Sequence, residues 1–145
     1  MNLDTLYQEV ILDHYKNPLN KKLSPTFDVQ VHHINPSCGD EITLNLTAVD
    51  GVISAITWDG VGCSISQASV SIASDLLMGK TFEQAQAISD EFVDLMQSKG
   101  KKVGDEQTLE DAVALAGVSQ YPARIKCALL GWMAIKDAAI QTQTK

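Results

Sequence analysis

The spacing of the apolar residues changes near residue 63, and this change constrains the fold more than any other feature of the sequence. Before it, apolar and polar residues alternate over 26–34, 41–49 and 52–58, which is typical of strands that bury one face. Asp50 and Gly51 stand between the last two segments and favour a tight hairpin turn. After it, apolar residues recur at helical spacing. The sequence therefore predicts an α+β fold, with a three-stranded antiparallel sheet packed against a helical layer.

The same spacing, together with end signals, predicts six helices. Thr81 and Gln84 form a capping-box pattern at the start of one of them. Ser89 is expected to cap a separate short helix, and Pro122 to begin the last one, where its missing N–H costs nothing. Residues 141–145 are expected to fray. The expected ranges are 3–15, 64–77, 82–88, 90–96, 108–116 and from 122 onward.

The size and charge of the chain argue against several classes of protein. With 145 residues, it is expected to form one domain over 1–145. No apolar run approaches the roughly 20 residues of a membrane span, and no basic-then-apolar leader is visible. We therefore expect a soluble, cytoplasmic protein without membrane association. The net charge of −7 argues against nucleic-acid binding and suits a protein that meets positively charged protein partners.

The chain has three cysteines, Cys38, Cys63 and Cys127, each in a different short motif. An odd number does not suit a secreted disulfide framework, and spaced cysteines in a reducing cytosol more often bind metal or perform catalysis. Any one of them could equally be a small apolar core residue. Together with Asp40, the thiols would supply four ligands, the number that a tetrahedral zinc ion or the iron pair of a cluster requires.

The neighbours of these groups favour a metal site that can open. Gly39 separates Cys38 from Asp40, and residues two apart on an extended chain point the same way. Cys63 stands at the expected start of a helix, where the helix dipole favours a thiolate. A carboxylate is a harder and more exchangeable ligand than a thiolate, so Asp40 would keep the site labile.

Three thiolates and a carboxylate around a divalent ion leave an excess of negative charge, which nearby cations should offset. Arg124 and Lys126 flank Cys127, so one of them is expected to lean toward the site. The alternative is a pair of solvated surface cations. The histidines stand beside none of the cysteines and are interpreted as structural or surface residues. They are His14, His32 and His33.

Four stretches occur in a fixed order along the chain. They are Leu-Tyr-Gln-Glu-Val-Ile-Leu-Asp-His-Tyr-Lys-Asn-Pro at 6–18, Asn-Pro-Ser-Cys-Gly-Asp at 35–40, Gly-Val-Gly-Cys-Ser-Ile-Ser-Gln-Ala-Ser at 60–69 and Pro-Ala-Arg-Ile-Lys-Cys-Ala-Leu-Leu-Gly-Trp at 122–132. In this order they resemble the signature stretches of the IscU-like (NifU N-terminal-like) iron–sulfur cluster assembly family. The resemblance runs from Leu6 to Met133 and implies the fold of that family.

Two departures from the scaffold branch of the family are similar to its SufU branch. Lys126 stands immediately before the third cysteine, where the scaffold branch has a histidine. The segment 80–104 is longer than in that branch and is expected to be a branch-specific helical insertion. The resemblance therefore implies a zinc-dependent sulfurtransferase in iron–sulfur cluster assembly. Such a protein accepts persulfide sulfur from a SufS-type cysteine desulfurase and passes it to downstream iron–sulfur assembly proteins.

By position, the resemblance implies that Cys38, Asp40, Cys63 and Cys127 bind zinc and that Cys38 is the catalytic, sulfur-accepting thiol. It also implies that Arg124 lies near them. Two alternatives stay open. The same ligands could hold iron or a [2Fe–2S] cluster on a scaffold that assembles and transfers it. In the other alternative, the protein is a non-catalytic module in which zinc is a structural staple.

Overall fold

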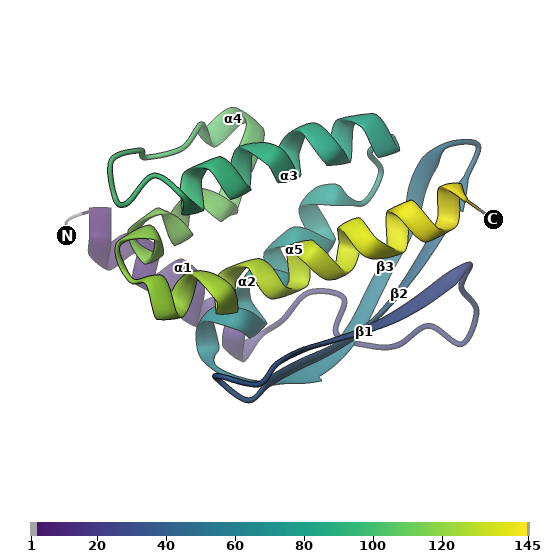
Figure 1. The fold of residues 1–145 in the computed structure, drawn as a ribbon, viewed down its shortest axis with the longest axis horizontal. Helices are drawn as coiled ribbons and strands as arrows, with labels where there is room; N and C mark the ends of the chain where they lie inside the picture. The colour runs from purple at the N-terminus through teal and green to yellow at the C-terminus, as the bar shows by residue number, and fades with distance from the viewer. Residues whose placement is uncertain (1–2, 145) are drawn as a thin grey trace.

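The computed structural model describes residues 3–144 and confirms the predicted α+β fold (Figure 1). Three strands precede most of the helices in the chain, and one helix comes before them. The elements are α1 (Leu3–Lys16), β1 (Val29–Asn35), β2 (Asp40–Val49), β3 (Val52–Val61), α2 (Ser64–Leu77), α3 (Phe82–Met96), α4 (Glu106–Leu109), the 3-10 helix η1 (Glu110–Gln120) and α5 (Pro122–Gln143).

The sheet is an antiparallel meander in the order β1-β2-β3, with Leu44 paired to Val31 on one side and to Trp58 on the other. The predicted hairpin at Asp50 and Gly51 is confirmed, and both residues have a positive φ, of 52° and 79°. This conformation matches the twist of the flanking strands, which explains why the Asp-Gly pair favours it.

Two strand boundaries differ from the prediction. β3 continues to Val61 because Gly60 lets the backbones of β2 and β3 approach closely, and a Cβ there would lie 2.3 Å from the carbonyl oxygen of Glu41. β1 begins only at Val29. The Ser24 hydroxyl forms hydrogen bonds with the backbone of Thr26 in a local turn. Thr26 therefore does not pair with β2.

One face of the sheet is covered by α5, which contacts β1 and β2, and by α2, which contacts β3 (Figure 1). The alternating residues Ile42, Leu44 and Leu46 of β2 are fully buried there. α2 and α5 touch closely at Gly131, where a Cβ would lie 2.6 Å from the side chain of Val70. These two helices therefore have a fixed spacing, and α1, α3 and η1 pack against them.

The prediction of a break at Ser89 is wrong, since α3 runs without interruption through this residue. Ser89 is buried inside the helix, and the apolar residues on both sides of it form one continuous stripe. The capping box of Thr81 and Gln84 is confirmed. The ring of Phe92 stacks on Trp132 with a centroid distance of 4.2 Å, which joins α3 to α5. That 80–104 is an insertion specific to one branch stays a prediction.

The helix expected over 108–116 is divided differently. Asp105 caps the four-residue helix α4, and Glu110 then takes φ 48° and ψ −126°, which ends it. The chain continues as η1 through Gly117, which does not stop it. Pro122 begins α5 as predicted, but the expected fraying from residue 141 is wrong, because α5 continues to Gln143. Lys145 lies outside the described residues. No helix within residues 3–144 is long and apolar enough to cross a membrane.

Candidate metal centre

Three segments that are distant in the sequence meet near one end of the sheet. The β1–β2 turn carries Cys38, β2 begins at Asp40, Cys63 caps the start of α2, and the second turn of α5 carries Cys127. One ligand atom from each of Cys38, Asp40 and Cys127 lies within 4.8 Å of the other two. The Sγ atoms of Cys38 and Cys127 are 3.1 Å apart. The structure thus brings three of the four predicted ligands into one tight group.

Asp40 is the most informative member of this group. Its side chain is fully buried, and its Oδ1 accepts a hydrogen bond from the backbone N–H of Cys63 at 2.9 Å. Its Oδ2 is also buried and has no hydrogen-bond partner among residues 3–144. A buried carboxylate oxygen without a partner is unfavourable by several kcal/mol, on the order of 2–7 for a polar group. A metal ion beside Oδ2 would satisfy it, so the donor set fits such an ion.

Cys63 is the N-cap residue of α2, and its Sγ accepts the N–H of Ser66 at 3.5 Å. The prediction that it stands at a helix start is confirmed. Its thiol is not in the tight group, but it contributes to raising the pKa of the Cys127 thiol. That Cys63 is the fourth ligand stays a prediction.

Cys127 is fully buried, whereas the other two cysteines are partly exposed. Burial, followed by the neighbouring Cys38, Asp40 and Cys63 side chains, raises the pKa of the Cys127 thiol far above its usual range. The physical cause is that several groups able to become anions share a small space away from water. A bound cation would reverse this preference, because it stabilises the thiolates together.

Arg124 stands one turn before Cys127 on α5. A hydrogen bond to Cys127, and after it the charges of Cys63 and Cys127, raise the pKa of the Arg124 guanidinium. The Arg124 side chain is exposed to solvent, and its charge acts together with those of the cysteines. The side chain of Lys126 is also exposed. Of the two flanking cations, Arg124 is the one that interacts with the cysteines.

Gly62 is required by the geometry of the centre. Its φ is 153°, and a Cβ at this position would lie 2.4 Å from Oδ1 of Asp40 and 2.7 Å from Oγ of Ser66. Any other residue would displace the carboxylate. The sequence analysis did not predict two further contacts of the cysteines. The backbone N–H of Ser66 donates to Sγ of Cys63, and the side-chain amide of Asn35 lies 3.9 Å from Sγ of Cys127. Both residues lie inside the quoted motifs, which is the signal that could have indicated them.

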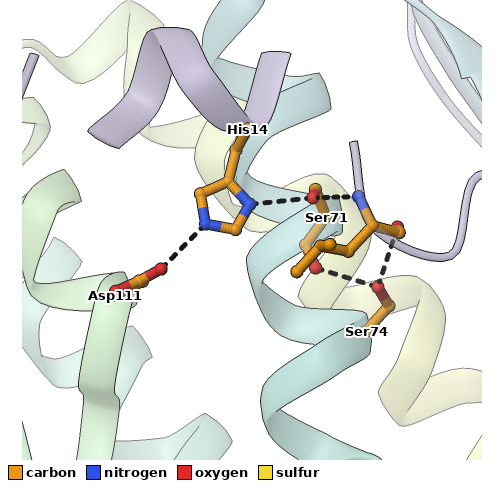
Figure 2. Close-up of polar contacts among 5 residues, drawn as sticks. His14, Ser71, Ser74 and Asp111 are labelled. Atoms are coloured by element: carbon orange, nitrogen blue, oxygen red, sulfur yellow. Dashed lines mark hydrogen bonds and ion pairs between the residues drawn. The ribbon is translucent and has the colours of Figure 1, made fainter. Parts of the chain in front are cut away.

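The histidines lie outside the centre. His14 is buried between three helical segments, with Nδ1 2.9 Å from Oγ of Ser71 and Nε2 2.9 Å from Asp111 (Figure 2). The order Asp–His–Ser resembles a hydrolytic triad, but Ser71 is fully buried and accepts the N–H of Leu19. A substrate cannot reach it. His32 bonds Glu41 and His33 bonds Asp137 on the sheet side.

Comparison with known proteins identifies the family of this chain. The sequence profile of the NifU-like N terminal domain matches residues 6–141. The chain belongs to this family. It is 46% identical to the zinc-dependent sulfurtransferase SufU of Bacillus subtilis (strain 168), over 98% of this chain and 95% of that protein.

Other relatives carry a different description. The iron–sulfur cluster assembly scaffold protein IscU of Streptococcus pyogenes serotype M1 is 39% identical over 94% of this chain and 84% of that protein. Among solved structures, FiSufU of Fervidobacterium islandicum AW-1 superposes with a TM-score of 0.84 at 30% identity, covering 95% of this chain and 99% of that one. The family therefore includes relatives described as sulfurtransferases and relatives described as scaffolds.

Proposed function

We propose that this protein is a zinc-dependent sulfurtransferase in iron–sulfur cluster assembly, with Cys38 as the sulfur-accepting thiol. The sulfur donor is a cysteine desulfurase, specifically one of SufS type, and the recipients are downstream iron–sulfur assembly proteins. The observation that carries the proposal is the contrast within the centre. Cys38 is partly exposed, whereas Asp40 and Cys127 beside it are fully buried.

Cys38, Asp40, Cys63 and Cys127 would hold the zinc ion. When bound, zinc would keep the thiols ionised and protect them from oxidation. The 46% identity to a protein described as a zinc-dependent sulfurtransferase supports the choice of zinc. The buried Oδ2 of Asp40, which has no hydrogen-bond partner in the described residues, supports an ion that is bound by oxygen as well as by sulfur atoms.

Among the four groups, Cys38 is best placed to meet a protein-bound persulfide. Cys38 lies in the β1–β2 turn, which Gly39 makes tight with a φ of 70°. The Cys38 thiol is partly exposed there. Its Sγ attacks the terminal sulfur of the donor persulfide, so a new bond forms between Sγ and that sulfur. The S–S bond of the donor breaks, and the donor cysteine leaves as a thiolate. The positive charge of Arg124 stabilises the thiolate form of the accepting Cys38.

The test is sulfur transfer to a Cys38→Ala variant. The purified protein is mixed with a SufS-type desulfurase and cysteine, and the Cys38 peptide is examined by mass spectrometry for one extra sulfur atom. The wild type should carry the sulfur and accelerate desulfurase turnover, whereas Cys38→Ala should do neither. Ser37→Ala, at the exposed neighbouring position, is the matched control. Undiminished acceleration by a folded Cys38→Ala protein would contradict the role of Cys38.

A second candidate is a scaffold that assembles a [2Fe–2S] cluster, favoured by the 39% identity to a relative described as a scaffold. The same thiols could ligate the iron pair. Here the cluster is cargo, and it should appear as visible absorbance after anaerobic reconstitution and should move to an apo-ferredoxin. Metal analysis of protein purified without added metal separates the two candidates, since zinc without iron favours the sulfurtransferase.

A further inference from the structure

A groove of about 300 Å³ lies between α1, α4 and η1, apart from the metal centre. Its apolar lining includes Tyr7 and Val10 of α1 and the buried Val113 and Ala114 of η1. Leu6 also lines it and is 46% exposed, so it adds apolar surface at the edge of the groove. None of the lining residues belongs to the metal centre. The groove therefore offers an apolar site that does not involve Cys38.

The rest of the lining is acidic. Glu106 of α4 and Glu110 and Asp111 at the start of η1 face the groove, and its lining includes neither lysine nor arginine. Carboxylates beside an apolar surface attract an occupant that has both apolar and positively charged groups. The excess of negative charge over the whole chain, a net charge of −7, strengthens this preference at long range.

Asp111 is held in a fixed orientation by His14 (Figure 2). The buried ring of His14 contacts Oδ2 of Asp111 through Nε2 and Ser71 through Nδ1, both at 2.9 Å. The Asp111 side chain is nevertheless 62% exposed, so the rest of its carboxylate faces solvent. A carboxylate that is already ordered loses less entropy when a cation binds it. His14 is thus a positioning residue for this edge of the groove.

The neighbouring Glu110 has a backbone conformation that residues other than glycine rarely adopt, with φ 48° and ψ −126°. Strain of this kind persists where the surroundings enforce it, and it is frequent at ligand-binding sites. Here it ends α4 and begins η1 at the groove, so both Glu106 and Glu110 line the same opening.

From these features we propose that the groove binds a basic amphipathic helix of a partner protein. An apolar side chain of that helix occupies the space between Val10 and Val113, and lysines or arginines beside it pair with Glu106, Glu110 and Asp111. Grooves between helices commonly receive such a helix through its apolar face. Because the groove shares no residue with the metal centre, this partner can stay bound while Cys38 exchanges sulfur.

The proposal is tested with two fluorescein-labelled helical peptides on the zinc-loaded full chain. Both have the same leucine-rich face, and one carries lysines where the other carries glutamines. The lysine peptide should bind more tightly by fluorescence anisotropy and should shift the backbone NMR signals of α1, α4 and η1. Replacing Glu106→Gln and Glu110→Gln together should weaken it about tenfold, as expected for two exposed ion pairs. The pair Glu83→Gln and Asp90→Asn on α3 is the matched control and should leave binding unchanged.

Several results would overturn the proposal. Equal binding of the glutamine peptide would show that the acidic rim has no role, and signal shifts confined to other elements would place the peptide elsewhere. Concentration-dependent dimers that disappear in Val10→Lys would make a second copy of this chain the occupant. Binding of calcium alone that is lost in the Glu106/Glu110 variant, without peptide binding, would make the rim a cation site.

Discussion

The backbone N–H of Cys63 donates a hydrogen bond to Oδ1 of Asp40 at 2.9 Å and so connects the start of α2 to the start of β2. The bond fixes one oxygen of the carboxylate and leaves the other, Oδ2, buried and without a hydrogen-bond partner within residues 3–144. Asp40 is therefore prepared to offer a single oxygen to an ion. The backbone of one proposed ligand orients the side chain of another.

Replacing Gly62→Ala should weaken zinc binding without touching a ligand. The new Cβ would lie 2.4 Å from Oδ1 of Asp40, so the carboxylate must move. We expect the zinc dissociation constant to rise by about tenfold or more, since overpacking of this kind costs about 1–3 kcal/mol. Competition with a chromogenic chelator measures the affinity. Gly51→Ala, where φ is also positive but no atom lies within 4 Å, is the control and should lower only stability. An unchanged zinc affinity in Gly62→Ala would refute the argument.

Removal of the metal by a chelator should leave the protein folded. The sheet and the α2–α5 layer enclose a continuous apolar core without help from the centre, which is typical of a chain of this size. Far-UV circular dichroism should change little, whereas the melting temperature should fall because the ion binds only the folded state. Loss of secondary structure on chelation would instead support zinc as a structural staple.

Arg124→Gln should slow sulfur acceptance. The Cys127, Cys63 and Cys38 thiols raise the pKa of the Arg124 guanidinium, so its charge in turn stabilises thiolates in the centre. We expect transfer from a persulfide donor to slow by roughly threefold to tenfold, with a smaller difference at high salt because solvent ions screen an exposed charge. Lys126→Gln is the matched variant, and a similar effect of both substitutions would show that only net charge near the site matters.

The contact between His33 and Asp137 predicts a pH dependence of stability. Hydrogen bonds from His33 and then Gln141 lower the pKa of Asp137 below its unfolded value of 3.8. The carboxylate therefore contributes stability that is fully present above about pH 5 and is lost as the pH falls through the lowered pKa. Because both side chains are partly exposed, the contribution should be below about 1 kcal/mol.

Urea unfolding of Asp137→Asn at several pH values measures this contribution. The wild type should be more stable at neutral pH and should approach the variant below pH 4. In a His33→Gln background the difference between Asp and Asn should shrink at neutral pH. A difference that grows toward acid pH would contradict the assignment.

Features that depend on neighbouring residues could be predicted from the sequence. Asp50 and Gly51 specify a turn by their own backbone preferences, and Cys63 stands where the apolar spacing changes. The predicted hairpin and the predicted helix start are therefore both confirmed. Ser89 was misread because a serine can cap a helix or be buried within one, and only packing decides. The positive φ of Glu110 could not be predicted, because residues other than glycine rarely adopt it and no local pattern indicates it.

Some features of the metal centre could likewise be predicted from neighbouring residues, and others depend on distant ones. Cys38 and Asp40 lie together as predicted, but the chain between them is not extended as expected, since Gly39 turns it with a φ of 70°. The approach of Cys127 requires α5 to cross the sheet, and the orphaned Oδ2 of Asp40 results from a hydrogen bond across 23 residues. The tie between His14 and Asp111 joins residues 97 apart in the chain. Such contacts exist only in the assembled fold.

The close contact between Gly131 and Val70 lies in the core and not in the metal centre, yet it sets how near α2 and α5 can come to each other. Cys63 lies about two helical turns before Val70, and Cys127 lies about one turn before Gly131. A larger side chain at position 131 would push the two helices apart and carry the two cysteines with them. The distance between these thiols is therefore controlled by the packing of a residue that is not a ligand.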